Sequence, residues 1–245
     1  MNIIITKNYD QMSSEAYNIV KELLIKKNNA VLGLATGSTP KGLYKNMIDD
    51  YKKGAVSYKN VCTYNLDEYV GLGKGDKQSY REFMRAYLFN HIDIDLNNTH
   101  LPSGKGDLQK ACDDYNKKLE AEKIDIQILG IGANGHIAFN EPGTSFDSVT
   151  HIVNLTPKTI RDNARFFDKL SDVPTQAITM GIANIMKAKK IVLMASGENK
   201  ANAVYNAIKG EITTSCPASI LRTHSDVTYI LDEQAASKLK LGESK

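Results

Sequence analysis

The chain has 245 residues, of which 42% are hydrophobic and 24% are charged, which is the composition of an ordinary soluble protein with one well-filled core. Its 31 Lys and Arg against 28 Asp and Glu leave a net charge of +3, which is too small to indicate a nucleic-acid or membrane-surface partner. Three widely spaced cysteines with no C-x-x-C pair indicate neither a disulfide framework nor a zinc site.

The first part of the chain alternates apolar, β-prone runs with helical periodicity. These patterns predict strand, helix, strand and helix in turn, over residues 2–6, 13–27, 30–35 and 40–53. The second strand runs into the loop ATGSTP, where Thr39 is predicted to cap the next helix and Pro40 to begin it. Because a helix amino terminus presents free N–H groups to an anion, Gly37, Ser38 and Thr39 are candidates for binding a phosphate. A plain capped turn explains the same residues equally well.

Two adjacent acids follow the next strand, which is predicted over residues 61–65. Asp67 and Glu68 stand just past its carboxyl end, in a predicted loop where such acids are most often solvated or capping residues. A glycine-rich segment, residues 71–75, then precedes a helix predicted over residues 79–90. The segment suits a lid over a site, although a surface loop explains it at least as well.

Chemistry-bearing residues are concentrated in the stretch IQILGIGANGHIAFNEPGTSF, residues 126–146, which follows a polar helix predicted over residues 107–122. It opens with a buried strand over residues 126–131, and the loop after the strand carries His136 and Glu141. In open α/β sheets, ligands bind at the carboxyl ends of the strands. This loop is therefore the predicted centre of the functional site.

Three glycines of this loop have the spacing of a dinucleotide-binding turn, at residues 130, 132 and 135. The context argues against that function, because Pro142 interrupts the helix that such a turn requires and no acid follows at the required distance. The glycines are expected to allow tight backbone turns beside a small ligand.

The last part of the chain continues the alternation. Strands are predicted over residues 151–155, 190–195 and 227–231, with helices from residue 157, over 179–186, after 200 and over 232–239. Strands and helices alternate along the chain with no linker and no repeat. Residues 1–245 are therefore predicted to form a single-domain, doubly wound α/β fold, Rossmann-like, in which a mostly parallel sheet carries helices on both faces.

The loop GIGANGHIAFNEPG, residues 130–143, resembles the signature loop of the glucosamine-6-phosphate deaminases, which are also called isomerases. Shorter matches at ATGSTP, NLDEYVGL and NARFFD extend the resemblance over most of the chain. The resemblance implies an enzyme of amino-sugar catabolism that converts glucosamine 6-phosphate and water to fructose 6-phosphate and ammonia. None of the steps requires a metal or an organic cofactor.

The implied reaction opens a pyranose ring and moves a proton between C2 and C1. Because imidazole exchanges protons well near neutral pH, His136 is the candidate for ring opening, and Glu141 is expected to orient it and stabilise its cation. The resemblance assigns Asn134 to the same relay, where many members carry Asp; an Asn can only hydrogen-bond and position. Asp67 matches the family's proton acceptor for the C2-to-C1 transfer.

The resemblance also implies a phosphate site. Gly37, Ser38 and Thr39 belong to the loop that the family uses for phosphate, and Arg165 and Lys200 match its basic phosphate contacts. By itself each basic residue reads as an ordinary surface charge.

Three other functions fit parts of the sequence. A galactosamine-6-phosphate deaminase differs only in the epimer that it accepts. A 6-phosphogluconolactonase has a related loop but lacks the F-N-E-P continuation of residues 139–142. A sugar-phosphate sensor of the kind carried by transcription regulators is disfavoured, because the first strand begins at residue 2 and the candidate acid and base are both present.

The sequence and the resemblance also predict the oligomeric state and the location of the protein. Larger family members are hexamers activated by an N-acetylated sugar phosphate, through basic residues soon after the signature loop and a longer carboxyl-terminal tail; here His151 and Val153 stand at those positions and the chain stops at Lys245. We expect an unregulated monomer or low-order homo-oligomer that binds an amino-sugar phosphate and neither nucleic acid nor membrane.

The amino-terminal apolar run is too short for a signal peptide, and no run approaches the roughly 18 apolar residues of a membrane span, so a cytoplasmic protein is expected.

Overall fold

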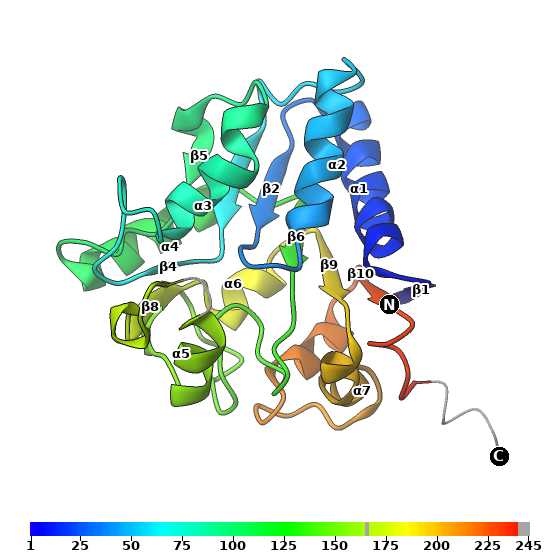
Figure 1. The fold of residues 1–245 in the computed structure, drawn as a ribbon, viewed down its shortest axis with the longest axis vertical. Coiled ribbons are helices and arrows are strands. Elements are labelled where there is room, and N and C mark those ends of the chain that lie inside the picture. The colour runs from blue at the N-terminus through cyan, green and yellow to red at the C-terminus, as the bar shows by residue number, and fades with distance from the viewer. Residues whose placement is uncertain (165–166, 240–245) are drawn as a thin grey trace.

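The computed structural model describes residues 1–164 and 167–239, and a large parallel sheet organises them (Figure 1). Its seven strands lie in the spatial order β1 (Asn2–Thr6), β10 (Val227–Asp232), β9 (Lys190–Ala195), β6 (Ile126–Leu129), β2 (Val31–Leu34), β3 (Cys62–Asn65) and β5 (Thr99–His100). Every neighbouring pair is parallel. The predicted doubly wound fold is confirmed.

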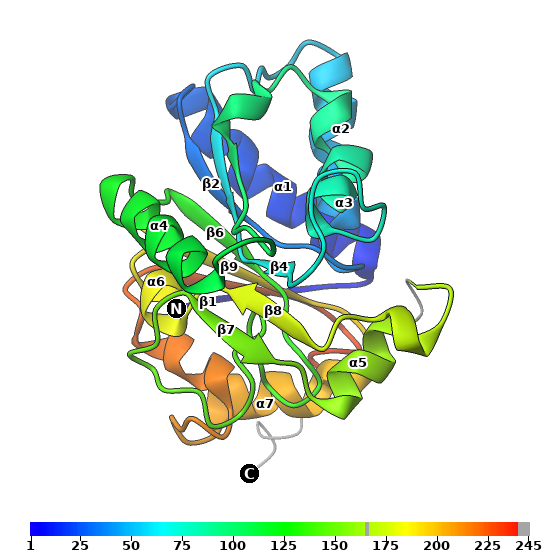
Figure 2. The same ribbon diagram turned by 90° about the vertical axis from the view of Figure 1, so that its left-hand side faces the viewer.

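Helices cover both faces of this sheet (Figure 2). The helices of one face are α1 (Tyr9–Lys26), α2 (Lys41–Lys52) and α3 (Tyr80–Tyr87), and those of the other are α4 (Leu108–Ala121), α6 (Ile182–Met186) and α7 (Ala201–Lys209). The side chains of β9 alternate between the faces, so that Val192 packs with the first group and Leu193 with the second. Among the described residues, no helix combines the length and apolarity that crossing a membrane requires.

A second, smaller sheet was not predicted. It consists of three antiparallel strands in the order β4 (Asp67–Tyr69), β8 (Gln176–Thr179) and β7 (His151–Asn154). The prediction of a loop at Asp67 and of a helix from residue 179 is therefore wrong, because Thr179 pairs with both Asp67 and His151. The helix begins only at Ile182, after Gly181.

The other predicted elements differ from the structure mainly at their ends. The seven predicted strands begin and end within two residues of observed strands. Helix α1 starts at Tyr9, four residues before the predicted start at residue 13. The Asn8 side chain caps it there by accepting a hydrogen bond from Gln11 N at 3.0 Å. Residues 233–239 form turns after β10 instead of the helix predicted over residues 232–239. The remaining α-helix, α5 (Pro157–Asn163), begins where predicted.

Short 3-10 segments complete the described elements. They are Phe89–His91, Leu96–Asn98, Leu170–Asp172, Glu198–Lys200 and Pro217–Thr223.

The order of the strands creates a place for a ligand. Strands β2 and β6 are neighbours, and the chain leaves β2 toward β3 on one side but leaves β6 toward β9 on the other. Where two connections diverge in this way, a crevice opens at the carboxyl ends of the strands. The loops that follow β2 and β6 border this crevice.

Candidate active site

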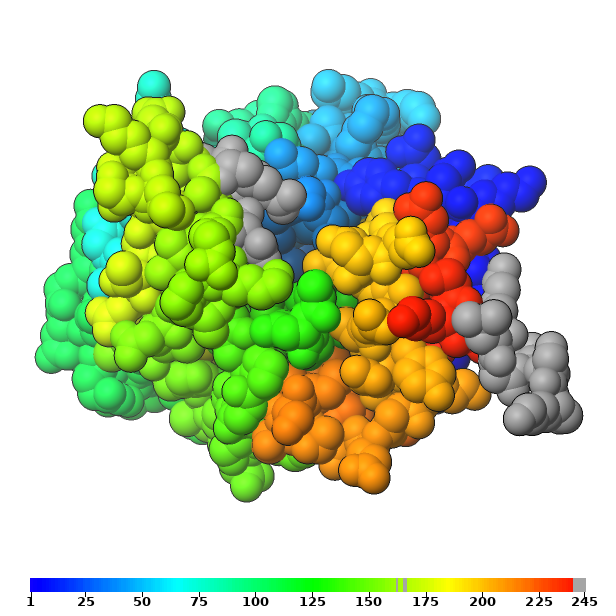
Figure 3. Space-filling view, turned by 60° about the horizontal axis from the view of Figure 1, so that its bottom comes forward, coloured from blue at the N-terminus to red at the C-terminus, as the bar shows by residue number. Residues whose placement is uncertain are grey.

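A cavity of about 700 Å³ lies at the carboxyl ends of the parallel strands, where β2 and β6 are neighbours. It is lined by the loop after β2, the loop after β6, the segment from β4 into α3, helix α5 and the start of α7. In Figure 3 the surface is hollowed between the yellow-green segment that contains α5 and the gold start of α7. The volume is in the range of small-molecule sites in general.

The loop after β2 lies on one side of the cavity. Gly37 and Thr39 line it, whereas Ser38 is exposed and does not. Gly37 has a φ of 89°, a left-handed conformation that glycine adopts without steric cost. Thr39 is not the predicted cap, because α2 begins at Lys41 after Pro40 and no side chain caps it. The Thr39 side chain instead approaches Gly130 of the loop after β6.

Lys200 lines the cavity from the start of α7, beyond the end of β9. Lys200 and the loop after β2 therefore border the same cavity, as a shared phosphate site requires. Arg165, the other predicted phosphate contact, lies outside the described residues.

The loop after β6 brings together the three residues predicted for a relay. The Asn134 amide donates a hydrogen bond to Glu141 Oε2 at 2.6 Å. His136 Nδ1 lies 3.4 Å from the same oxygen, an ion-pair distance that is too long for a strong hydrogen bond. His136 and Asn134 line the cavity, whereas Glu141 lies behind them and is 8% exposed.

The environment of Glu141 keeps it ionised. Burial alone would raise the pKa of this carboxyl, but the neighbouring His136 and the hydrogen bonds from Thr159 and Asn134 outweigh burial and lower the pKa to about 2. A carboxylate that stays charged can stabilise an imidazolium throughout the neutral range.

Asn140 holds the turn of this loop instead of facing the ligand. Its fully buried amide donates to the carbonyls of Ile137 at 3.0 Å and Met180 at 2.9 Å. Within that turn, Ala138 has a φ of 53°, an uncommon conformation for a residue with a side chain, and it lines the cavity. Such strain of about 1–3 kcal/mol is typical of functional loops.

Asp67 lines the cavity from the first position of β4. It is only 6% exposed, so the interpretation of a solvated acid is wrong. Burial, with a smaller contribution from the charge of Glu68, raises the pKa of Asp67 to about 8. Because a buried carboxyl with a raised pKa is a strong base once ionised, Asp67 suits proton abstraction.

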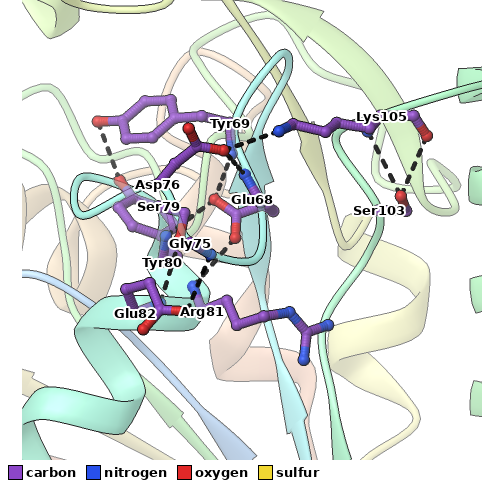
Figure 4. A network of polar contacts seen from close by, with 11 residues as sticks. Glu68, Tyr69, Gly75, Asp76, Ser79, Tyr80, Arg81, Glu82, Ser103 and Lys105 are labelled. Atoms are coloured by element: carbon purple, nitrogen blue, oxygen red, sulfur yellow. Dashed lines mark hydrogen bonds and ion pairs between the residues drawn. The ribbon is translucent and has the colours of Figure 1, made fainter.

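Glu68 does not line the cavity, but it accepts hydrogen bonds from the backbone of the segment that does (Figure 4). Its Oε1 accepts hydrogen bonds from Tyr69 N and Tyr80 N, both at 2.9 Å, and its Oε2 accepts one from Arg81 N at 3.0 Å. These donors include the first backbone N–H groups of α3, whose positive end attracts the carboxylate. Glu68 therefore fixes the amino terminus of α3 beside Asp67.

An aromatic wall was missed by the sequence analysis. Tyr80 stacks on Phe139 with ring centres 6.1 Å apart and packs against Tyr69 at 4.7 Å, and Phe167 meets Tyr69 edge-on at 5.8 Å. All four rings line the cavity. Tyr69, Phe139 and Phe167 fall inside the quoted motifs, whereas no sequence signal marked Tyr80.

Helix α5 contributes Thr159, a further residue of the site that was not predicted from the sequence. Lys158, Thr159 and Asn163 line the cavity, and the Thr159 hydroxyl donates to Glu141 Oε1 at 2.5 Å. Nothing local marks Thr159, because a threonine in the first turn of a helix is usually read as a capping residue. Its partner is 18 residues away in sequence.

Comparisons with known proteins agree with this arrangement. Residues 6–230 match the family model described as glucosamine-6-phosphate isomerases/6-phosphogluconolactonase. A glucosamine-6-phosphate deaminase of Thermoanaerobacter sp. (strain X514) is 54% identical over 239 residues, which are 97% of this chain and 94% of the relative. A solved structure described as a monomeric glucosamine-6-phosphate deaminase is 44% identical, with a TM-score of 0.95 over 97% of this chain and 99% of that chain.

More distant structures share only the fold. The 6-phosphogluconolactonase from Trypanosoma brucei has a TM-score of 0.79 over 97% of this chain and 98% of its own, but the identity is 19%.

Proposed function

The chain belongs to the family of glucosamine-6-phosphate isomerases and 6-phosphogluconolactonases, and we propose that within it the protein is a glucosamine-6-phosphate deaminase. It would convert glucosamine 6-phosphate and water to fructose 6-phosphate and ammonia. The observation that carries the proposal is that a buried acid with a raised pKa, Asp67, shares one cavity with the imidazole of His136.

The phosphate of the substrate is proposed to bind at the loop after β2. Gly37 and Thr39 present backbone and hydroxyl groups there, and Lys200 adds a positive charge from the start of α7. Ser38 belongs to the same turn. Because it is exposed and does not line the cavity, we propose that only its backbone contributes. Arg165 is proposed as a second cationic contact. Binding the dianion at this end positions the reacting carbons deeper in the cavity.

Ring opening is assigned to His136. It takes the proton of the C1 hydroxyl and returns one to the ring oxygen, so that the C1–O5 bond breaks and the aldehyde forms. Glu141 stabilises the imidazolium that forms between these transfers, and Asn134 holds the Glu141 carboxylate in place. Since Asn134 is a neutral donor here, the negative charge of this relay belongs to Glu141 alone.

Asp67 is assigned the proton transfer between the two carbons. It removes the C2 proton of the open-chain aldehyde and delivers it to C1, while the C1 oxygen gains a proton and the amino group loses one, which gives the imine of fructose 6-phosphate; water then adds at C2 and ammonia leaves. With a pKa of about 8, only roughly a tenth of the free enzyme carries an ionised Asp67 at pH 7. The ammonium group of the substrate, brought beside it, favours the ionised form.

The imidazole, the buried acid and the comparisons together favour a deaminase over a 6-phosphogluconolactonase. Lactone hydrolysis releases no nitrogen and moves no proton from carbon, so it lacks the proton transfer that is assigned here to Asp67. The lactonase structure named above shares the fold at 19% identity, against 54% for the deaminase. The alternative substrate is the C4 epimer, galactosamine 6-phosphate, which a direct assay distinguishes.

The test is a direct assay of the purified protein with three substrates: glucosamine 6-phosphate, galactosamine 6-phosphate and 6-phosphogluconolactone. We expect ammonia and fructose 6-phosphate in equal amounts from the first. Release of ammonia only from the galactosamine compound, or hydrolysis of the lactone alone, would replace the proposed substrate.

The assignment of the base has its own control. Asp67→Asn should bind glucosamine 6-phosphate and yet fail to exchange its C2 proton with deuterium from the solvent. Exchange at the wild-type rate would remove Asp67 from the mechanism.

We also propose that the protein acts as a monomer without an allosteric activator. The solved relative at 44% identity is described as monomeric, and His151 and Val153 stand where larger members carry basic residues. A sigmoidal rate curve that N-acetylglucosamine 6-phosphate makes hyperbolic would refute this.

A further inference from the structure

A chain of hydroxyl groups connects helix α5 to the carboxylate behind His136. Thr156 Oγ1 and Thr159 Oγ1 lie 2.9 Å apart, and Thr159 Oγ1 lies 2.5 Å from Glu141 Oε1. We propose that Thr159 is a positioning residue for ring opening, which holds Glu141 in the one orientation that serves His136. The inference rests on the proposed function and deepens it, because it adds to the relay a residue that the sequence did not single out.

The direction of each hydrogen bond follows from the charge of Glu141. An ionised carboxylate only accepts, so the Thr159 hydroxyl must donate to it. The hydrogen between the two threonines must then come from Thr156, whose oxygen in turn accepts from the backbone N–H of Thr159 at 3.1 Å. The single donor of the Thr159 hydroxyl is therefore committed to Glu141 and is not free for a substrate.

The two oxygens of Glu141 have separate tasks. Oε1 is bound by Thr159, while Oε2 accepts from Asn134 and faces the Nδ1 of His136. Glu141 is 8% exposed and does not line the cavity, so water has little access to replace a lost donor. Without Thr159, Oε1 would be a buried anionic oxygen lacking a partner, and the carboxylate would rotate or shift to find one. Either movement takes Oε2 away from His136.

The same helix also lines the cavity. Lys158 and Asn163 of α5 border the space in which the substrate would lie, and Thr159 stands between them in sequence. A single short helix therefore contributes both to the substrate cavity and to the orientation of the catalytic pair. The Thr156 cap that starts α5 extends this connection to the backbone of the helix.

The test compares two threonines that contact the same glutamate. Thr159→Val removes the hydroxyl that donates to the carboxylate, with nearly the same shape. Thr144→Val is the matched control, because the Thr144 hydroxyl donates to the Glu141 backbone carbonyl at 2.7 Å and leaves the carboxylate alone. We expect Thr159→Val to lower kcat about 10- to 100-fold with KM within about twofold, Thr159→Ser to restore most of kcat, and Thr144→Val to keep it.

A second measurement separates ring opening from binding. The open-chain alcohol 2-amino-2-deoxyglucitol 6-phosphate cannot form a ring, so its binding requires no ring opening. We expect its Kd to be the same for the wild type and Thr159→Val. A Kd that rises in step with the loss of kcat would make Thr159 a substrate contact or a structural residue and overturn the proposal.

A double-mutant cycle keeps the proposal testable if Thr159→Val is unstable. If Thr159 acts through Glu141, adding Thr159→Ser or Thr159→Val to Glu141→Gln should lower kcat by less than about twofold further. Additive losses would overturn the proposal, as would wild-type kcat in Thr159→Val. A wild-type protein that releases no ammonia would instead refute the proposed function itself.

Discussion

The imidazole of His136 lies directly against the backbone of Gly132, in space that any other residue at that position would fill. A Cβ built on Gly132 would stand 2.4 Å from Cε1 of the ring and 2.5 Å from both ring nitrogens, well inside van der Waals contact. The Gly132 N–H also donates to the His136 carbonyl at 2.9 Å, which closes the turn between them. The ring position is therefore set by the absence of a side chain.

Gly132→Ala should consequently displace the imidazole and leave the fold in place. We expect kcat to fall about 100-fold, because general acid–base catalysis depends on hydrogen-bond reach and contributes about 10²- to 10⁴-fold. Steady-state kinetics with a thermal unfolding curve checks this. Gly73→Ala is the control: a Cβ there meets only Lys105 at 3.7 Å, outside the cavity. Normal kcat in Gly132→Ala would mean that His136 does not need its observed place.

The raised pKa of Asp67 predicts the pH dependence of activity. Only the ionised carboxylate accepts a carbon-bound proton, so kcat/KM should rise tenfold per pH unit below about 8 and level off above it. The kcat profile should lie at lower pH, because the substrate ammonium stabilises the anion in the complex. Measuring both profiles between pH 5 and 9 tests this. Identical profiles would show that substrate charge has no influence on Asp67.

The raised pKa of Asp67 also predicts how stability depends on pH. Stability should fall over the pH range in which activity rises. The folded state holds a proton on Asp67 up to about pH 8, whereas the unfolded state releases it near pH 4, so the contribution of Asp67 to stability falls as pH rises between these values. Asp67→Asn has no charge to bury. Its Tm should exceed that of the wild type by a margin that grows from pH 4 to 8. Each kcal/mol of difference in the free energy of unfolding should raise Tm by about 2–4 °C. A constant margin would contradict the pKa.

The sequence predicted six of the seven strands of the large sheet, because short apolar runs such as residues 190–195 are identified by local pattern alone. It missed the two-residue strand β5. Of the small sheet it predicted β7 but neither β4 nor β8. Strand β4 reads Asp-Glu-Tyr, and its burial depends on β8 beside it and on Gly104, whose Cα approaches the Tyr69 carbonyl too closely for a side chain. Such long-range contacts leave no periodic signal.

For the site, motifs in the sequence indicated the residues that meet in the cavity but not their environments. His136 and Asp67 both line it. That Asp67 is buried and that Glu141 lies behind the imidazole follow from packing, which only the structure supplies. Thr159 was missed because its function depends on a partner in another segment.

Asp125 offers a test of stability without a change in activity. It precedes β6 at the amino end of the strand, away from the cavity, and its 4% exposed side chain accepts from Lys27 at 2.6 Å, Lys189 at 2.8 Å and Val31 N at 2.8 Å. Asp125→Asn should lower the free energy of unfolding by about 2 kcal/mol at pH 7, since it weakens a mostly buried pair whose lysines still reach water. Urea denaturation measures this, and kcat/KM should not change.

The exposed pair of Lys45 and Asp49 is the matched control. Asp49→Asn should have no measurable effect on urea unfolding, because solvent screens that pair. Equal losses in both variants would show that burial does not set the strength of the Asp125 contacts.

The contacts of the Tyr9 hydroxyl predict an effect on phosphate binding that can be separated from the effect on catalysis. Its hydroxyl lies 3.0 Å from the Ser38 carbonyl and 3.1 Å from that of Thr39, and it accepts a hydrogen bond from Gly42 N at 2.8 Å. One group thus joins α1, the loop after β2 and the first turn of α2. Tyr9→Phe removes all three contacts and keeps the ring that packs beside Gly42. The loop should lose part of its preorganisation, while the acid and base stay as they are.

We therefore expect Tyr9→Phe to raise KM for glucosamine 6-phosphate about 3- to 10-fold, the equivalent of one hydrogen bond, with kcat within twofold. The inhibition constant of inorganic phosphate should rise by the same factor, because the loop binds the phosphate and not the sugar. Tyr17→Phe on the same helix, whose hydroxyl contacts Asp50 at 2.8 Å, should leave both constants unchanged. A fall in kcat with a normal inhibition constant for phosphate would move the influence of Tyr9 from the loop to the chemistry.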